Sequence, residues 1–212
     1  MPYRIREGLS YCLCEGHPVF LDIGLGRYFT LPSHLCAPFA AVVADEDAGV
    51  DARDIARLLT LRVIETGAPR AMSAMPLRMP SSEVTALRPR GRTIRAAVAQ
   101  GFASHRVHHI ALRKLLTIEA ARRPSDRIAE DGELGRLRGA FDRVAIMFGE
   151  ADRCLPRSLA FRRLALREGH SPALVIGVKI DPFAAHCWVQ SGTRIDNDSV
   201  ERVRLFTPIY SL

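Results

Sequence analysis

The clearest chemical signal in the sequence is Cys154, which opens a predicted helix. Pro156 suits the first turn of that helix, so Cys154 lies where free backbone N–H groups and the positive end of the helix dipole meet. Both favour the thiolate, the nucleophilic form of cysteine. The chain has 5 cysteines with no framework spacing, which predicts reduced thiols and a sulfur available for covalent chemistry.

A nucleophilic cysteine needs a base, and His186 begins a predicted strand that could hold one opposite Cys154. Alternation along that strand places Trp188 and Gln190 on the face of His186 and points Cys187 away from the site. Trp188 is therefore a candidate substrate-binding residue, beside the base and able to shape the channel that leads to it.

A catalytic imidazole also needs an acceptor for its second nitrogen. Ser191–Gly192–Thr193 predicts a hairpin turn, and the return strand 194–198 carries Asp196 and Asp198 on one face. Either carboxylate could lie beside His186, and the geometry of a hairpin does not choose between them.

The N-terminal third predicts a small antiparallel meander followed by helices. The three short strand patterns are Ser10–Leu13, Pro18–Asp22 and Arg27–Leu31. Ser33 can cap a following helix, and Asp51 can cap another that extends through Ile64 to a stop at Gly67. We predict a winged-helix-like module over residues 1–68.

The remaining chain divides into a proline-rich linker, residues 69–92, and a larger mixed domain, residues 93–212. A helix beginning at Thr93 should bury an apolar stripe of Ile94, Val98 and Phe102. Two more helices follow, and then three strands. These expected elements are Leu134–Phe148, Cys154–Glu168, Leu174–Ile180, His186–Gln190 and Arg194–Asp198. The fold class is therefore α+β.

Several motifs of the second domain resemble the lasso peptide biosynthesis B protein, a transglutaminase-like, papain-like cysteine peptidase. They are Cys154-Leu-Pro-Arg-Ser-Leu-Ala, Leu174-Val-Ile-Gly-Val, Pro182-Phe-Ala-Ala-His-Cys-Trp-Val and Ile195-Asp-Asn-Asp. The resemblance implies a catalytic triad of Cys154, His186 and Asp198. It also implies hydrolysis of the bond that joins a leader peptide to its core.

The first domain resembles the leader-recognition element of such systems, through Val19-Phe-Leu-Asp and Gly26-Arg-Tyr-Phe-Thr-Leu. That family binds the leader as an added strand at a sheet edge. The resemblance therefore implies leader-binding roles for five residues: Arg27, Tyr28, Phe29, Thr30 and Leu31. It also implies two partners, the precursor peptide and an asparagine-synthetase-like cyclase that uses ATP, and no cofactor for the hydrolysis itself.

Composition limits the alternatives. The net charge of +7 comes from scattered arginines with only 7% aromatic residues, which does not favour a nucleic-acid platform. We expect no metal site, no membrane span or signal peptide, and a cytoplasmic protein. Two other functions fit parts of the sequence: transglutaminase-type acyl transfer to an amine, and a winged-helix DNA-binding regulator.

Overall fold

The computed structural model describes residues 3–46, 49–67, 77–130, 132–148 and 153–212. The chain forms two compact units, Met1–Ser73 and Ala74–Leu212, each of which is described by itself. The boundary falls inside residues 68–76, which lie outside the described part of the chain.

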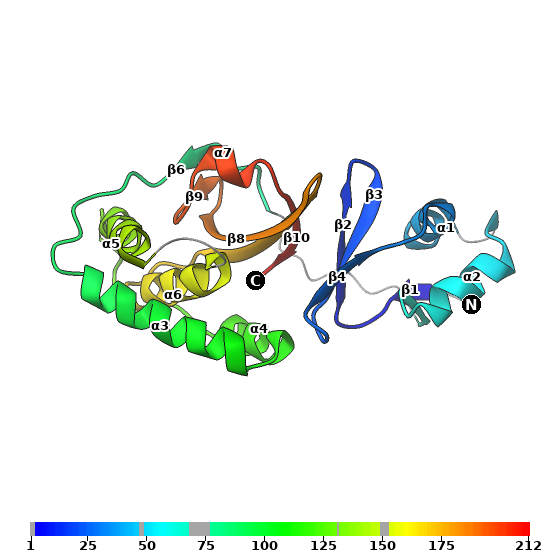
Figure 1. Cartoon of the computed structure of the whole chain (residues 1–212), viewed down its shortest axis with the longest axis horizontal. Helices are drawn as coiled ribbons and strands as arrows, with labels where there is room; N and C mark the ends of the chain where they lie inside the picture. The colour runs from blue at the N-terminus through cyan, green and yellow to red at the C-terminus, as the bar shows by residue number, and fades with distance from the viewer. Residues whose placement is uncertain (1–2, 47–48, 68–76, 131, 149–152) are drawn as a thin grey trace. The chain divides into compact units, whose positions relative to one another are not determined.

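The first unit contains the predicted meander. Strands β2 (Leu9–Cys14), β3 (His17–Asp22) and β4 (Arg27–Thr30) pair antiparallel in the order β2-β3-β4. Strands β1 (Tyr3–Ile5) and β5 (Ile64–Thr66) form a second, two-stranded antiparallel sheet (Figure 1). Strand β4 is therefore at one edge of the three-stranded sheet, with β2 at the other.

Two helices, α1 (Ser33–Val43) and α2 (Ala52–Thr60), complete the first unit. Asp51 caps α2 as predicted, accepting a hydrogen bond from the backbone N–H of Arg53 at 2.8 Å. Two details of the prediction were wrong. Pro32, with no side-chain bond, occupies the cap position expected for Ser33, and Ile64 lies in β5 because the chain leaves α2 through Arg62 at φ +55°.

The second unit is built on a five-stranded sheet of order β10-β7-β8-β9-β6. Its second strand, β7 (Ala173–Ile180), is a nearly continuous apolar run, as expected for a strand covered on both faces. Beside it lie β8 (Phe183–Ser191) and β10 (Thr207–Ser211), and the sheet ends in β9 (Arg194–Ile195) and β6 (Ser82–Glu83). Neither β6 nor β10 was predicted from the sequence.

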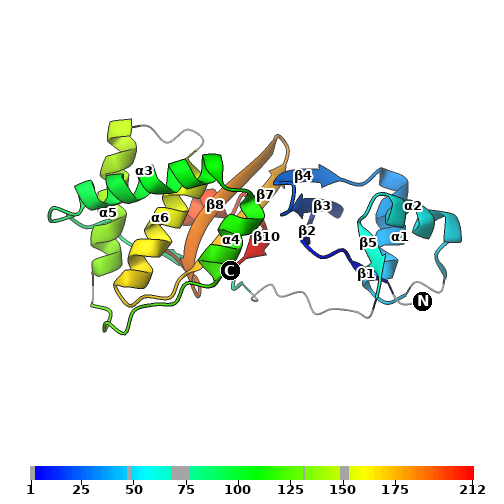
Figure 2. The same ribbon diagram turned by 90° about the horizontal axis from the view of Figure 1, so that it is seen from below.

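Helix α6 (Cys154–Arg167) packs on β8, and α3 (Thr93–His109) packs on α6. Figures 1 and 2 show α3, α4 (Leu112–Ala120), α5 (Glu133–Phe148) and α6 gathered on one side of the sheet. The short helix α7 (Val200–Val203) lies on the other side. Helix α6 thus lies between strand β8 and the two helices α3 and α5.

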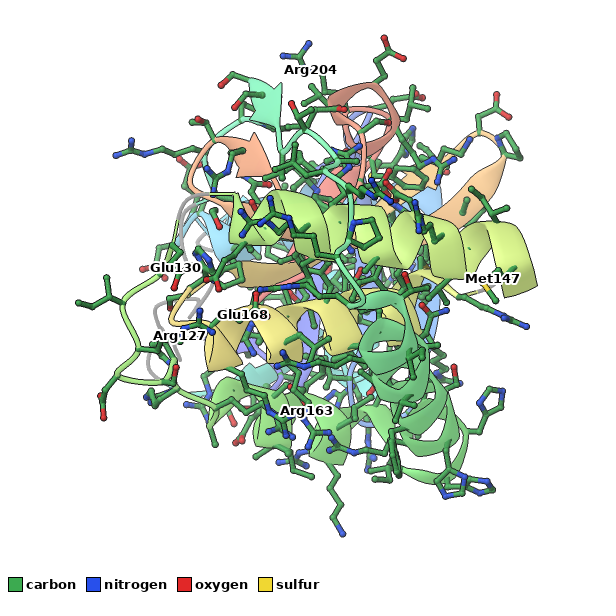
Figure 3. The ribbon with its side chains drawn as sticks, turned by 90° about the vertical axis from the view of Figure 1, so that its left-hand side faces the viewer. Arg127, Glu130, Met147, Arg163, Glu168 and Arg204 are labelled. Atoms are coloured by element: carbon green, nitrogen blue, oxygen red, sulfur yellow. The ribbon has the colours of Figure 1, made fainter. Side chains whose placement is uncertain are left out.

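The helices are held at one end by buried carboxylates. Glu168 accepts a hydrogen bond from Arg92 at 2.7 Å, and Glu133 accepts one from Arg127 at 2.6 Å. Figure 3 shows Arg127 and Glu168 at one end of this helix layer and Met147 at the opposite end of α5. Arg92, which precedes α3, also donates to Glu133 at 3.5 Å, so it ties α3 to both α5 and α6. The start of α6 lies at the other end.

Two further predictions need correction. The predicted linker 69–92 contributes β6 from residue 82 onward, and Val84 is buried, so residues 77–92 belong to the second unit. The expected stripe on α3 is also misplaced: Ile94, Val98 and Phe102 are 77%, 53% and 63% exposed, and the buried face carries Ala96 and Ala103. Small residues occupy the buried face of α3 because this helix packs closely against α6.

Candidate functional site

Cys154 occupies the first position of α6, as its sequence context predicts, and is only partly exposed. The backbone N–H groups of Leu155 and Cys187 donate hydrogen bonds to its sulfur. The first belongs to the open end of α6 and the second to strand β8, which lies against this helix. Both donors favour the charged form of the thiol over the neutral form.

His186, on β8, links Cys154 to Asp198. Its Nε2 lies 2.6 Å from Oδ2 of Asp198, and its side chain is also hydrogen-bonded to Cys154. Because Asp198 takes Nε2, the nitrogen that faces the sulfur is Nδ1. The structure thus brings the three residues predicted from sequence into one line of sulfur, imidazole and carboxylate.

Asp196, the other candidate for the carboxylate, lies elsewhere. It is fully buried and accepts hydrogen bonds from Ser191 at 2.5 Å and Arg194 at 3.2 Å. The expected return strand ends at Ile195, because the side chain of Asn197 takes the N–H of Val189 that a continuing strand would take. Beyond that point the chain turns, and Asp198 reaches His186.

Electrostatics favour an ion pair between Cys154 and His186. Burial alone raises the pKa of Cys154, but the hydrogen bond and charge of His186 and the two backbone donors outweigh it, so that pKa is lowered. Burial alone lowers the pKa of His186, but hydrogen bonds to Asp198 and Cys154 raise it to about 9. The pKa of Asp198 is lowered, chiefly by His186 working against burial. All three shifts act in one direction, favouring thiolate, imidazolium and carboxylate over the neutral forms.

We expect this ion pair to set the pH dependence of Cys154 alkylation by iodoacetamide. In the wild type, reaction at Cys154 should persist to lower pH than at an ordinary thiol, because His186 and the two backbone donors lower the pKa of Cys154. Replacing His186 by glutamine should move the acidic limb of the rate profile to higher pH, because only the two backbone donors then oppose the effect of burial on the pKa of Cys154. Peptide mapping of the alkylated thiol as a function of pH measures this, and identical profiles for both proteins would contradict it.

A second hydrogen-bond network, not predicted from the sequence, connects the three segments that carry Cys154, His186 and Asp198. Asn197 donates to the hydroxyl of Ser158 at 2.9 Å, and Ser158 donates to the carbonyl of Cys187 at 2.8 Å. Ser158 is one helical turn beyond Cys154, and Asn197 and Cys187 adjoin Asp198 and His186 in sequence. Both Ser158 and Asn197 are buried. The only sequence signal was the spacing of Ser158 from Cys154 along one helix face.

Replacing Ser158 by alanine should remove the hydrogen bonds that connect Asn197 to the carbonyl of Cys187. The substitution removes the partner of a side-chain N–H of Asn197 and of the carbonyl of Cys187, both buried. The free energy of unfolding should fall by about 1–3 kcal/mol. The substitution should also slow alkylation of Cys154 at neutral pH, because His186 is held less firmly. Ser125→Ala is the control, since that exposed hydroxyl donates to the carbonyl of Arg167 at 2.9 Å, far from the site. An equal loss of stability in both variants would contradict the prediction.

The sulfur and the imidazole open onto a cavity of about 430 Å³. Its described walls come from α3, α5, α6, β8 and the segment that follows β9, and they are mostly polar. The lining residues are Gln100, Arg138, Asp142, Ala145, Arg153, Cys154, Arg157, Ser158, Ala185, His186, Cys187, Asn197, Asp198, Ser199 and Arg202. A cavity of this size beside an activated thiolate can admit part of a peptide for nucleophilic attack.

Two predictions on β8 were wrong. Trp188 is 1% exposed and packs in the core with Val175 and Ile195, so it is not a surface on which substrate could lie. Cys187 was expected to point away from the site, yet it lines the same cavity as Cys154 and is buried. The reason is that the nucleophile comes from the helix beneath β8, on the face that Cys187 occupies, while His186 reaches it from the opposite face.

The predicted leader-binding residues of β4 differ in their exposure. Arg27 and Thr30 are exposed on the edge strand, and Tyr28 is partly buried. Phe29 stacks on Phe20 with ring centroids 5.0 Å apart and also contributes to the core. Leu31 follows the strand and is buried in the core, so its side chain is not available at the edge, contrary to the prediction.

Within the described residues, no group of three or more histidine, cysteine or acidic side chains is arranged to hold a metal ion. None of the helices in that part of the chain combines the length and the apolar character needed to cross a membrane.

The comparison with protein families agrees with the geometry of the site. Residues 95–211, more than half of the chain, match the family model described as the transglutaminase-like superfamily. That stretch contains Cys154, His186 and Asp198, and also the whole of α6, β7 and β8. No curated protein matches the chain, and no solved structure matches it. The chain therefore belongs to the transglutaminase-like superfamily.

Proposed function

We propose that this protein is the leader peptidase of a lasso peptide pathway, which binds the leader of a precursor and hydrolyses the bond between leader and core. One observation carries the proposal: the side chains of Cys154, His186 and Asp198 lie in line at a cavity, with His186 donating a 2.6 Å hydrogen bond to Asp198. A separate unit with an open sheet edge adds a place where a peptide could be held.

The proposed reaction is acyl transfer to water. The Cys154 thiolate attacks the carbonyl carbon of the scissile bond and forms a tetrahedral oxyanion, for which the backbone N–H of Cys154 is a natural donor. Collapse breaks the C–N bond, and His186 gives its proton to the leaving amine of the core. Water, deprotonated by His186, then hydrolyses the thioester and releases the leader with a free carboxylate.

The leader is proposed to add to the edge strand β4 as a further strand, through main-chain hydrogen bonds. Hydrogen–deuterium exchange on the full chain tests this directly. A leader peptide should slow exchange in Arg27–Thr30 and leave the opposite edge strand, Leu9–Cys14, unchanged. Slower exchange at Leu9–Cys14 alone would place the leader on the wrong edge and overturn this part of the proposal.

The activity itself is tested by mass spectrometry of a precursor peptide incubated with the protein. A free leader carboxylate and a free core amine support hydrolysis. A new isopeptide bond to an added amine would instead support transglutaminase-type acyl transfer. A mobility shift of duplex DNA that weakens with salt, together with an intact precursor, would favour a winged-helix DNA-binding regulator.

The product of the proposed hydrolysis is a core peptide with a free N-terminal amine. The proposed next enzyme is an asparagine-synthetase-like cyclase, which would use ATP to join that amine to a side-chain carboxylate. ATP is thus assigned to the partner, and the hydrolysis needs no cofactor. The proposed location of both enzymes is the cytoplasm.

A further inference from the structure

Gln100 is an unusual residue for the face of α3 that it occupies. It is 6% exposed and lies on the same buried face as Ala96 and Ala103, where α3 packs against α6. Gln100 is also one of the residues that line the cavity at Cys154. A helix interface between small residues gives no packing reason for a long polar side chain.

The carbonyl oxygen Oε1 of Gln100 is buried, and no residue of the described chain donates a hydrogen bond to it. Leaving a buried acceptor unpaired costs free energy, and most such groups in folded proteins are paired. Gln100 lines the cavity, so a ligand that brings a donor would pair this buried oxygen once the amide group turns towards it.

A second buried glutamine of the same unit shows how a purely structural one is held. Gln190 is 2% exposed, and its Oε1 accepts from Trp188 at 3.1 Å. Its Nε2 donates to the carbonyls of Arg78 at 2.7 Å and Gly192 at 2.6 Å. Gln190 therefore provides a matched reference for Gln100.

The other side-chain acceptors that line the cavity are already engaged. Asp142 accepts from Arg157 at 2.6 Å, and Asp198 accepts from His186 at 2.6 Å. Asn197 uses its oxygen for the N–H of Val189, and Ser158 accepts from Asn197. A peptide that enters the cavity brings main-chain N–H groups, which lose water and need acceptors.

We infer that Gln100 is a substrate-binding residue whose Oε1 accepts a hydrogen bond from a main-chain N–H of the bound peptide, beside the scissile bond. This inference rests on the proposed peptidase function. The bond would align the peptide with the sulfur of Cys154, and it would form only when substrate is present. Gln100 would thus contribute to kcat/KM while adding nothing to the stability of the free protein.

The test compares Gln100→Met with Gln190→Met, since methionine matches glutamine in length and lacks its polar atoms. For Gln100→Met we expect an unchanged or higher Tm and a kcat/KM lower by about tenfold. For Gln190→Met we expect a lower Tm, because three hydrogen bonds are lost. A Gln100→Met protein with a lower Tm and wild-type kcat/KM would assign Gln100 a structural role and overturn the inference.

The bonded atom is tested with peptides that are N-methylated at one main-chain nitrogen at a time. At one position near the scissile bond, N-methylation should lower the kcat/KM of the wild type about tenfold. The same methylation should leave the kcat/KM of Gln100→Met unchanged. If no position shows this coupling, the assignment to a main-chain N–H is wrong. A wild-type protein that cleaves no peptide would contradict the proposed function instead, and the Tm comparison distinguishes that result.

Discussion

Replacement of Cys154 by alanine should reduce peptide cleavage by roughly 10⁴-fold or more, because burial raises the pKa of Cys187, the other thiol of the cavity, and keeps it from acting as the nucleophile. Leader binding should stay at the wild-type level, since the proposed leader-binding strand β4 belongs to the other unit. Cleavage is measured by mass spectrometry and leader binding by fluorescence anisotropy.

Cys36→Ala is the matched control for this experiment. Cys36 is a free, partly exposed thiol on α1, in the first unit, and its removal should leave cleavage unchanged. Full activity in Cys154→Ala would mean that the nucleophile lies elsewhere. Loss of leader binding in that variant would contradict the separation of binding and cleavage between the two units.

Asp198→Asn should lower kcat/KM by roughly 10²- to 10⁴-fold, within the range that general acid–base catalysis supplies. The neutral amide cannot hold the imidazolium as the carboxylate does, so the pKa of His186 should fall from about 9. His186 must be protonated to release the amine, so activity is lost as the pH rises through the pKa of His186. In Asp198→Asn, the alkaline limb of the kcat/KM profile should therefore move to lower pH.

Asp196→Asn is the corresponding control. Burial raises the pKa of Asp196, and its partners are Ser191 and Arg194, with no bond to His186. An amide of the same shape should leave the alkaline limb in its place. If Asp196→Asn moved that limb and Asp198→Asn did not, the roles assigned to the two carboxylates would be reversed.

The two aspartates also show where reasoning from the sequence ended. Alternation along a hairpin places Asp196 and Asp198 on one face, and this holds only while the return strand continues. The strand stops after Ile195, because Asn197 offers a side-chain acceptor to Val189. Side-chain capping of a strand is a tertiary event, so strand periodicity could not anticipate it.

Trp188 and the apolar stripe of α3 were mispredicted for a related reason. Periodicity identifies the faces of a strand or a helix, but it does not identify which element covers each face. Trp188 is on the side of the sheet that meets Val203. The large side chains Ile94 and Phe102 lie outward, because the approach of α6 requires the small residues of α3 inside.

The sequence alone determined the start of the nucleophile helix, the two long strands, and the identities of the sulfur and the imidazole that face each other. These follow from local signals: a cysteine before a proline in a first turn, an unbroken apolar run, and a hairpin turn. Only the tertiary structure decided which carboxylate reaches His186. It also brought Ser158 and Asn197 together, where they hydrogen-bond the segments that carry the site. It also placed a glutamine with an unpaired oxygen in the cavity wall. Those features depend on contacts between segments distant in sequence, which no local pattern records.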